Sequence, residues 1–143
     1  FSSRRRHTRY ISVTGVQTYA LPIWIRNTSK LTTHPLRGAI FEGMVVTELI
    51  KKRTNAGLEI NLFYWRDKTG HEIDIIVDDG GKLLPIEIKS GKTINAEFFK
   101  NIKYWSNLSK SNKSMLLYAG EQSQKRTSGN EILNWRNLIN HEL

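Results

Sequence analysis

Runs of apolar residues separated by turn-forming residues divide most of the chain into a small set of expected elements. Apolar side chains recur at intervals of three and four up to Lys52, which predicts an amphipathic helix that begins at Leu36 or Gly38. Three runs of strand-forming residues follow this helix, at residues 58–65, 70–77 and 83–89. Short turn sequences containing Asp and Gly separate these runs, so the three strands are expected to form an antiparallel meander.

The second half of the chain adds an expected helix, a buried strand and a last helix. Residues 93–108 carry apolar side chains at spacings of four, four and three, which predicts a helix. The continuous apolar run at residues 114–119 predicts a buried strand, parallel to the strand at 83–89 through a right-handed crossover. Residues 120–129 are expected to be a surface loop and residues 130–140 a C-terminal helix. The predicted fold is therefore α/β, in the order α-β-β-β-α-β with a mixed sheet flanked by helices.

The beginning of the chain differs from the rest. Residues 1–23 hold four arginines and no acidic residue, and their apolar residues have no helical period. They resemble the translation of sequencing-adapter DNA, so we expect a non-native tail that carries no functional information. The natural sequence is then expected to have continued further upstream. Residues 24–37 are interpreted as a connector and residues 38–143 as the functional domain.

Composition narrows the class of protein. A length of 143 residues, 38% of them hydrophobic, suits one domain, and the absence of cysteine excludes disulfides and thiolate metal sites. No apolar run approaches the roughly 20 residues of a membrane span, and no secretory signal is present, so we expect a cytoplasmic protein. The net charge is +9, and without the tail the remaining 18 basic and 13 acidic residues still give +5, which favours a polyanionic partner such as nucleic acid.

Charged side chains inside apolar strands mark the candidate site. Asp74 lies in the second predicted strand, and Glu87 and Lys89 lie two residues apart in the third, so both point to one face. If helices cover both faces of the sheet, these charges lie in a partly enclosed cleft, where ionised groups are usually paired, metal-bound or functional. Two carboxylates and the Ile88 carbonyl are oxygen ligands suited to Mg²⁺ or Mn²⁺, and a lysine can orient water or pair with a phosphate. An ion pair on an exposed sheet face is the alternative.

Four segments, in this order, resemble one protein family: Gly38-x-x-Phe41-Glu42-x-x-Val45-x-x-Glu48-Leu49, Phe63-Tyr64-Trp65-Arg66, Glu72-Ile73-Asp74 and Ile86-Glu87-Ile88-Lys89. Together with the order of elements, they resemble the PD-(D/E)XK nuclease superfamily, which has a restriction-endonuclease-like core. More closely, residues 36–119 resemble the nuclease-like domain of unknown function that lies C-terminal to AAA-type ATPase modules in bacteria and archaea. Gly43 departs from the family pattern, in which asparagine is expected.

The resemblance implies roles for individual residues. Asp74 and Glu87 would be metal ligands, Lys89 the catalytic lysine, and Glu48, or else Glu42, the carboxylate supplied by the first helix. Exposed cations that could contact nucleic acid, or simply form a solvated surface, are Arg66, Lys92, Lys100 and Lys103.

The ATPase module is expected to be missing from this chain. Ser90-Gly91-Lys92-Thr93 imitates the end of a phosphate-binding loop, but Ile86 stands where the first glycine is required, so no ATP site is predicted. Three functions stay open: a metal-dependent phosphodiesterase on DNA or RNA, a catalytically inactive module that binds nucleic acid or protein and regulates the ATPase, and an α/β domain with a surface ion pair.

Overall fold

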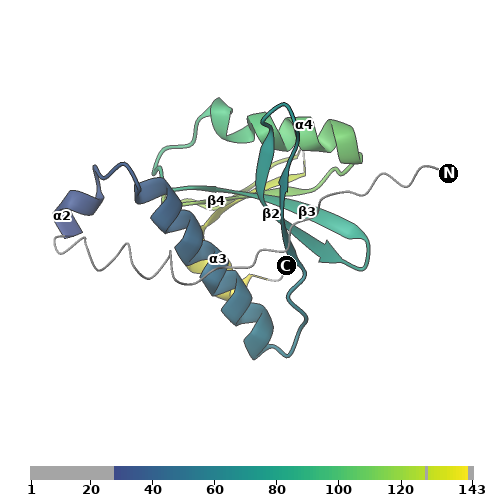
Figure 1. Cartoon of the computed structure of the whole chain (residues 1–143), viewed down its shortest axis with the longest axis horizontal. Coiled ribbons are helices and arrows are strands. Elements are labelled where there is room, and N and C mark those ends of the chain that lie inside the picture. Colours follow the sequence, from purple (N-terminus) through teal and green to yellow (C-terminus); the bar gives the residue numbers. More distant parts are fainter. Residues whose placement is uncertain (1–27, 128, 142–143) are drawn as a thin grey trace.

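Six strands form one mixed, open sheet in the order β1-β2-β3-β4-β6-β5 (Figure 1). The computed structural model describes residues 28–127 and 129–141. β1, β2 and β3 pair antiparallel, β4 runs parallel to β3, β6 runs parallel to β4, and β5 is antiparallel to β6. The strands are β1 (Leu62–Arg66), β2 (Glu72–Asp79), β3 (Lys82–Lys89), β4 (Ser114–Tyr118), β5 (Gln124–Lys125) and β6 (Asn130–Asn134).

Helices cover both faces of this sheet, with α3 on one face and α4 on the other (Figure 1). α3 ends where Gly57 adopts a positive φ of 68°, which lets the Leu58 N–H donate back to the Arg53 carbonyl oxygen at 2.9 Å. Within the described residues, no helix combines the length and the apolar character needed to cross a bilayer. The helical elements are α2 (Thr28–Leu31), α3 (Arg37–Asn55), the 3₁₀ turn η1 (Ala96–Phe99), α4 (Lys100–Ser109) and the 3₁₀ turn η2 (Trp135–Asn140).

The core consists of two apolar layers that share the sheet. Alternate side chains of the central strands point to opposite faces, so Ile86 and Ile88 pack against α3, whereas Leu116 and Ile132 pack with η1 and α4. A third buried cluster, under the start of β2, joins Ile73 and Ile76 to Trp105 of α4. Both faces of the central part of β2 and β3 are therefore covered, which places Asp74 and Glu87 among the buried residues.

Most of the predicted elements are confirmed. The first helix, the three-stranded meander and the parallel strand β4 are present, although α3 extends three residues further and β1 begins later than expected. The segment predicted as one helix at residues 93–108 is divided into η1 and α4. The expected connector at residues 24–37 contains the short helix α2, and the interpretation of residues 1–23 lies outside the described residues.

The predicted C-terminal helix is wrong, because residues 130–140 form strand β6 followed by η2. Ile132 faces the α4 side and Leu133 faces the α3 side, so this strand is buried on both faces. In a strand that is buried on both faces, apolar residues stand next to one another instead of alternating with polar ones. Such a run can be mistaken for the apolar stripe of an amphipathic helix. The loop expected at residues 120–129 likewise contains β5, a two-residue edge strand.

Gly120 follows β4 in a position that admits no side chain. A Cβ there would lie well inside the van der Waals contact distance of the Tyr118 ring and of the Lys92 carbonyl oxygen. Gly120→Ala should therefore lower the free energy of unfolding by about 2 kcal/mol or more, measured by urea denaturation. Gly38→Ala is the matched control, because nothing lies within 4 Å of its Cβ, and it should stabilise α3 by about 0.5 kcal/mol. Equal effects of the two variants would contradict the packing described here.

Candidate active site

The site lies where β2 and β3 diverge. Their backbone pairing begins at the hairpin and ends at Ile75 and Ile86. Beyond that pair, the Asp74 carboxylate replaces the missing strand partner, since its Oδ2 accepts a hydrogen bond from the Ile88 N–H at 2.7 Å. The gap between the two strands is therefore occupied by a carboxylate that is 8% exposed.

A β-bulge in β2 accounts for this position of Asp74. Trp65 of β1 pairs with Ile73, and Phe63 pairs with Ile76, so two residues of β2 stand opposite Tyr64 alone. An extra residue of this kind bends the strand and changes the direction of neighbouring side chains. The bulge contains Asp74, which turns toward β3 while Ile73 stays packed against Trp105 of α4.

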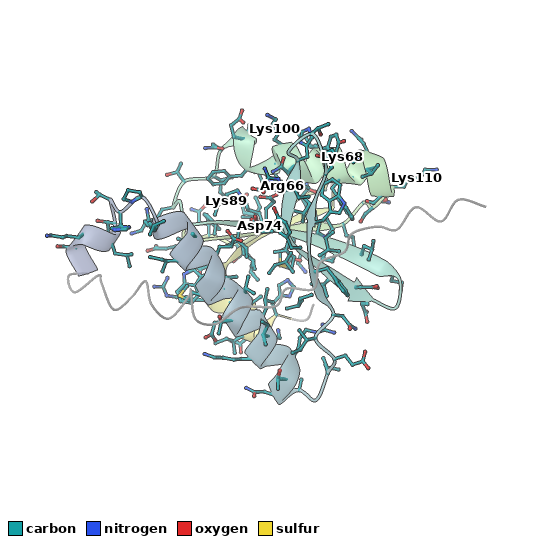
Figure 2. All side chains as sticks on the ribbon, in the orientation of Figure 1. Arg66, Lys68, Asp74, Lys89, Lys100 and Lys110 are labelled. Atoms are coloured by element: carbon teal, nitrogen blue, oxygen red, sulfur yellow. The ribbon has the colours of Figure 1, made fainter. Side chains whose placement is uncertain are left out.

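Lys89 joins the two carboxylates of the site. Its Nζ lies 2.6 Å from Glu87 Oε2 and 3.4 Å from Asp74 Oδ2. Glu87 is only 1% exposed, whereas the Lys89 side chain is 31% exposed, so the ammonium closes the cluster on its solvent side. The three side chains that the sequence pattern grouped therefore converge (Figure 2 labels Asp74 and Lys89).

The cluster has oxygen atoms left over for a ligand. Glu87 Oε1 is buried and accepts no hydrogen bond of normal geometry from residues 28–127 or 129–141. The N–H and C=O of a strand residue point to the same edge, so the Ile88 carbonyl oxygen faces the gap into which its N–H donates. Two carboxylates and one carbonyl fit Mg²⁺ or Mn²⁺, because such ions use few protein carboxylates and keep several waters. Within the described residues, no group of three or more His, Asp or Glu side chains is placed to hold a metal ion, so the Ile88 carbonyl is needed as the third oxygen ligand.

Burial and mutual repulsion control the charges of the cluster. Burial, followed by the nearby Asp74 carboxylate, raises the pKa of Glu87 to about 7, although Lys89 partly offsets this. Burial alone would lower the pKa of Lys89, but the Asp74 and Glu87 carboxylates raise it above its usual value. Lys89 therefore stays cationic near neutral pH, while Glu87 can gain or lose a proton there.

The helix carboxylate near the cluster is Glu42. Burial, with smaller contributions from Asp74 and Glu72, raises the pKa of Glu42 to about 7, which places this side chain on α3 beside the strand carboxylates. Glu48, the residue preferred from the resemblance, is instead directed away from them. Its Oε1 lies 2.9 Å from Lys51 Nζ, and it lines a small cavity with Trp135 of η2.

The helical spacing contains the signal that distinguishes these two glutamates. At 100° per residue, Glu42 lies at the centre of the buried stripe formed by Val45, Val46 and Leu49, whereas Glu48 lies about 120° away from that centre. A carboxylate in the middle of a buried stripe has to face another charged group or a ligand. Here Asp74 and Lys89 are charged groups near enough to shift the pKa of Glu42.

Of the four predicted nucleic-acid contacts, Arg66 lies beside a carboxylate of β2, and the three lysines are exposed. Arg66 Nη1 lies 3.8 Å from Glu72 Oε2, and the Tyr64 hydroxyl donates to the same oxygen at 2.8 Å. Figure 2 shows Arg66 between Asp74 and α4, with Lys100 further out. Lys92, Lys100 and Lys103 are exposed, and they do not contact the carboxylate cluster.

Sequence reasoning missed Asn101, a residue of α4. Its side chain lies near Glu87 and lowers the pKa of that carboxyl, and its Oδ1 lies 3.3 Å from His71 Nδ1. A carboxylate can only accept hydrogen bonds, so the Asn101 amide group faces Glu87, and its oxygen accepts from the His71 ring. No sequence pattern distinguishes an asparagine on a polar helix face from other surface residues, so the role of Asn101 could be found only from the fold.

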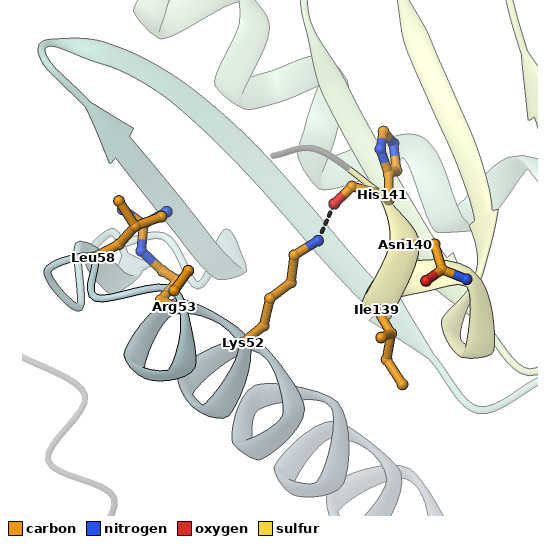
Figure 3. Close-up of a pocket in the computed structure, with 7 residues that line it drawn as sticks. Lys52, Arg53, Leu58, Ile139, Asn140 and His141 are labelled. Atoms are coloured by element: carbon orange, nitrogen blue, oxygen red, sulfur yellow. Dashed lines mark hydrogen bonds between the residues drawn. The ribbon is translucent and has the colours of Figure 1, made fainter.

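A cavity lies away from the charged cluster, at the C-terminal end of α3 (Figure 3). Its volume is about 460 Å³. Lys52 crosses toward η2, where its Nζ donates to the backbone oxygens of Leu138 and His141. The Arg53 Nε donates to the Glu59 carbonyl oxygen at 2.7 Å, so both cations at this cavity tie chain segments together. Its lining residues are Lys52, Arg53, Ala56, Leu58, Ile139, Asn140 and His141.

Comparison with known proteins gives one match. Residues 37–138 match the family model described as "Domain of unknown function (DUF4143)". No curated protein and no solved structure matches the chain significantly. The matched region contains every residue of the charged cluster.

Glu42→Gln tests the placement of the helix carboxylate. A carboxyl pKa raised from 4.5 to about 7 means that the folded protein holds this proton more tightly than the unfolded chain does. The stabilisation from Glu42 is therefore complete below pH 4.5 and is lost as the pH rises through about 7. Between about pH 5 and pH 8, the wild type should lose about 1–2 kcal/mol of unfolding free energy relative to Glu42→Gln, allowing for solvent screening of a half-buried group.

Urea denaturation at the two pH values measures this difference. Glu48→Gln is the matched control on the same helix, and it should keep the pH dependence of the wild type because its carboxylate lies beside Lys51 at the surface. Identical pH profiles for Glu42→Gln and the wild type would show that Glu42 does not face the cluster.

Proposed function

The chain belongs to the family described as a domain of unknown function (DUF4143), and we propose that its site cleaves phosphodiester bonds of DNA or RNA with a divalent metal ion. The observation that supports this proposal best is the convergence of Asp74, Glu87 and Lys89 at the point where β2 and β3 diverge. We further propose that the α/β core is restriction-endonuclease-like. In this proposal the domain acts in the cytoplasm as part of a larger protein with an AAA-type ATPase module, as the four sequence segments suggest.

Asp74, Glu87 and the Ile88 carbonyl would hold Mg²⁺ or Mn²⁺. A divalent ion there lowers the pKa of a bound water and offsets negative charge on the scissile phosphate. The residues of the chain prepare the site for it. Within the described residues, Glu87 Oε1 is a buried acceptor that no hydrogen bond of normal geometry satisfies, and Glu42 adds negative potential from α3.

Lys89 has two roles in this proposal. Without a metal ion, its ammonium compensates the two buried carboxylates, which would otherwise repel each other. With a metal ion bound to those carboxylates, the ammonium is free to pair with a phosphate oxygen or to orient the attacking water. Its side chain is partly exposed, so a substrate can reach it from solvent.

Metal binding should be detectable without any activity. Millimolar Mg²⁺ or Mn²⁺ should raise the melting temperature of the wild type, and more at about pH 8 than at about pH 6, because the ligand carboxyls must lose their protons. Asp74→Asn should abolish the effect while keeping an acceptor for the Ile88 N–H. Asp79→Ala removes an exposed carboxylate from the same strand, and it should respond like the wild type. Equal stabilisation of all three proteins would argue against this metal site.

Cleavage is the direct test. Incubation of the full-length parent with labelled single- and double-stranded DNA and RNA in Mg²⁺ or Mn²⁺ should yield products that are absent in EDTA. Asp74→Asn and Lys89→Met should each reduce the rate by about 100-fold or more, whereas Asp79→Ala should not change it. If the parent cleaves none of these substrates, the phosphodiesterase proposal fails. Salt-sensitive binding that survives Asp74→Asn would then identify the inactive regulatory module.

A further inference from the structure

An aromatic surface formed by Trp65, His71 and Tyr104 borders the carboxylate cluster, and we propose that it binds an unpaired nucleobase. This inference rests on the proposed phosphodiesterase function and makes it more specific. The substrate would be single-stranded nucleic acid, or an unpaired segment of a duplex, with one base stacked on this surface and a neighbouring phosphate at Lys89.

The three rings come from separate elements and form a continuous surface. His71 stacks on Tyr104, with centroids 3.8 Å apart and an interplanar angle of 13°. Trp65 lies next to Tyr104, at 6.3 Å and 34°. Below them, the buried Trp105 meets Trp65 edge-on at 4.8 Å, so the surface has a rigid support. Two stacked rings, with a tilted third ring beside them on a fixed base, form a surface on which a planar ligand can stack.

The core does not account for the outer part of this surface. Trp105 completes the buried cluster with Ile73 and Ile76, and Trp65 packs partly against that cluster. Tyr104 belongs to none of the buried clusters and is 36% exposed. Part of the Tyr104 ring is therefore accessible to a ligand from solvent.

Hydrogen bonds hold the surface in place and connect it to the active site. The His71 backbone N–H donates to Asp67 Oδ1 at 3.0 Å, and its ring donates to Asn101 Oδ1 at 3.3 Å. Asn101 lies beside Glu87. One side chain therefore separates the stacked rings from a proposed metal ligand, which places a bound base within the reach of a single nucleotide from the cluster.

Cations surround the aromatic surface, as binding of a nucleic-acid strand requires. Arg66 follows Trp65 directly, and its side chain is 60% exposed. Lys100 lies one helical turn before Tyr104, and Lys68 lies in the turn between β1 and β2 (Figure 2). Proteins that bind single strands combine such cations, which contact phosphates, with aromatic rings, which stack on bases. The faces of paired bases are covered in a duplex, so this combination favours unpaired nucleotides.

Fluorescence anisotropy with a labelled oligothymidylate of about 15 nucleotides, in EDTA, tests the surface without cleavage. The wild type should bind this single strand more tightly than a duplex of equal length. Tyr104→Ala should weaken single-strand binding by about 5-fold or more, and Tyr104→Phe, which keeps the ring, should bind within about twofold of the wild type. Leu108→Ala is the matched control, because Leu108 is 60% exposed one turn further along α4, and it should bind normally. Melting temperatures establish that the variants are folded.

His71→Ala provides a second, independent variant, and it should weaken single-strand binding in the same way by removing the ring stacked on Tyr104. The inference is overturned if Tyr104→Ala and His71→Ala bind like the wild type, or if the duplex binds as tightly as the single strand. These outcomes are separate from those of the cleavage test. Aromatic-dependent binding without cleavage would remove the phosphodiesterase proposal alone, whereas cleavage that is indifferent to Tyr104 would remove the base subsite alone.

Discussion

The contact of Lys89 with two buried carboxylates is the constraint on which the site depends. Glu87 and Asp74 are almost completely buried, and a buried carboxylate is costly unless it is paired or hydrogen-bonded. Lys89 Nζ and the Ile88 N–H supply those partners, and the Ile88 N–H can bond to Asp74 because the pairing of β2 with β3 stops at the Ile75–Ile86 pair. The gap between the two strands therefore makes room for the charged side chains, and their contacts replace the backbone hydrogen bonds that are missing there.

The packing of the sheet follows from the same arrangement. Since β3 is covered by α3 on one face and by α4 on the other, its alternate residues serve different layers. Ile86 and Ile88 fill the α3 layer, which leaves Glu87 and Lys89 on the α4 side, where Asn101 meets Glu87. Residues that build the core and residues that build the site therefore alternate directly along β3.

Sequence patterns predicted the elements whose apolar residues repeat at a regular spacing, and they missed the elements whose apolar residues do not. The amphipathic helix α3 and the alternating meander were predictable, and so was the pairing of Asp74 with Glu87 and Lys89. β6 was not, because a strand buried on both faces shows consecutive apolar residues rather than alternation. The bulge at Asp74 and the approach of Asn101 arise from pairing register and helix docking, which no local pattern records.

The order in which the strands follow one another also affects how the site assembles during folding. Asp74 and Lys89 are close neighbours in sequence, joined by one hairpin, so little chain entropy is lost when they meet. The parallel pairs of β4 with β3 and of β6 with β4 require longer connections and close larger loops. A topology of this kind favours early formation of the meander, with the parallel half of the sheet added onto it. The charged cluster would then begin as a local structure and become desolvated only when α4 closes over it.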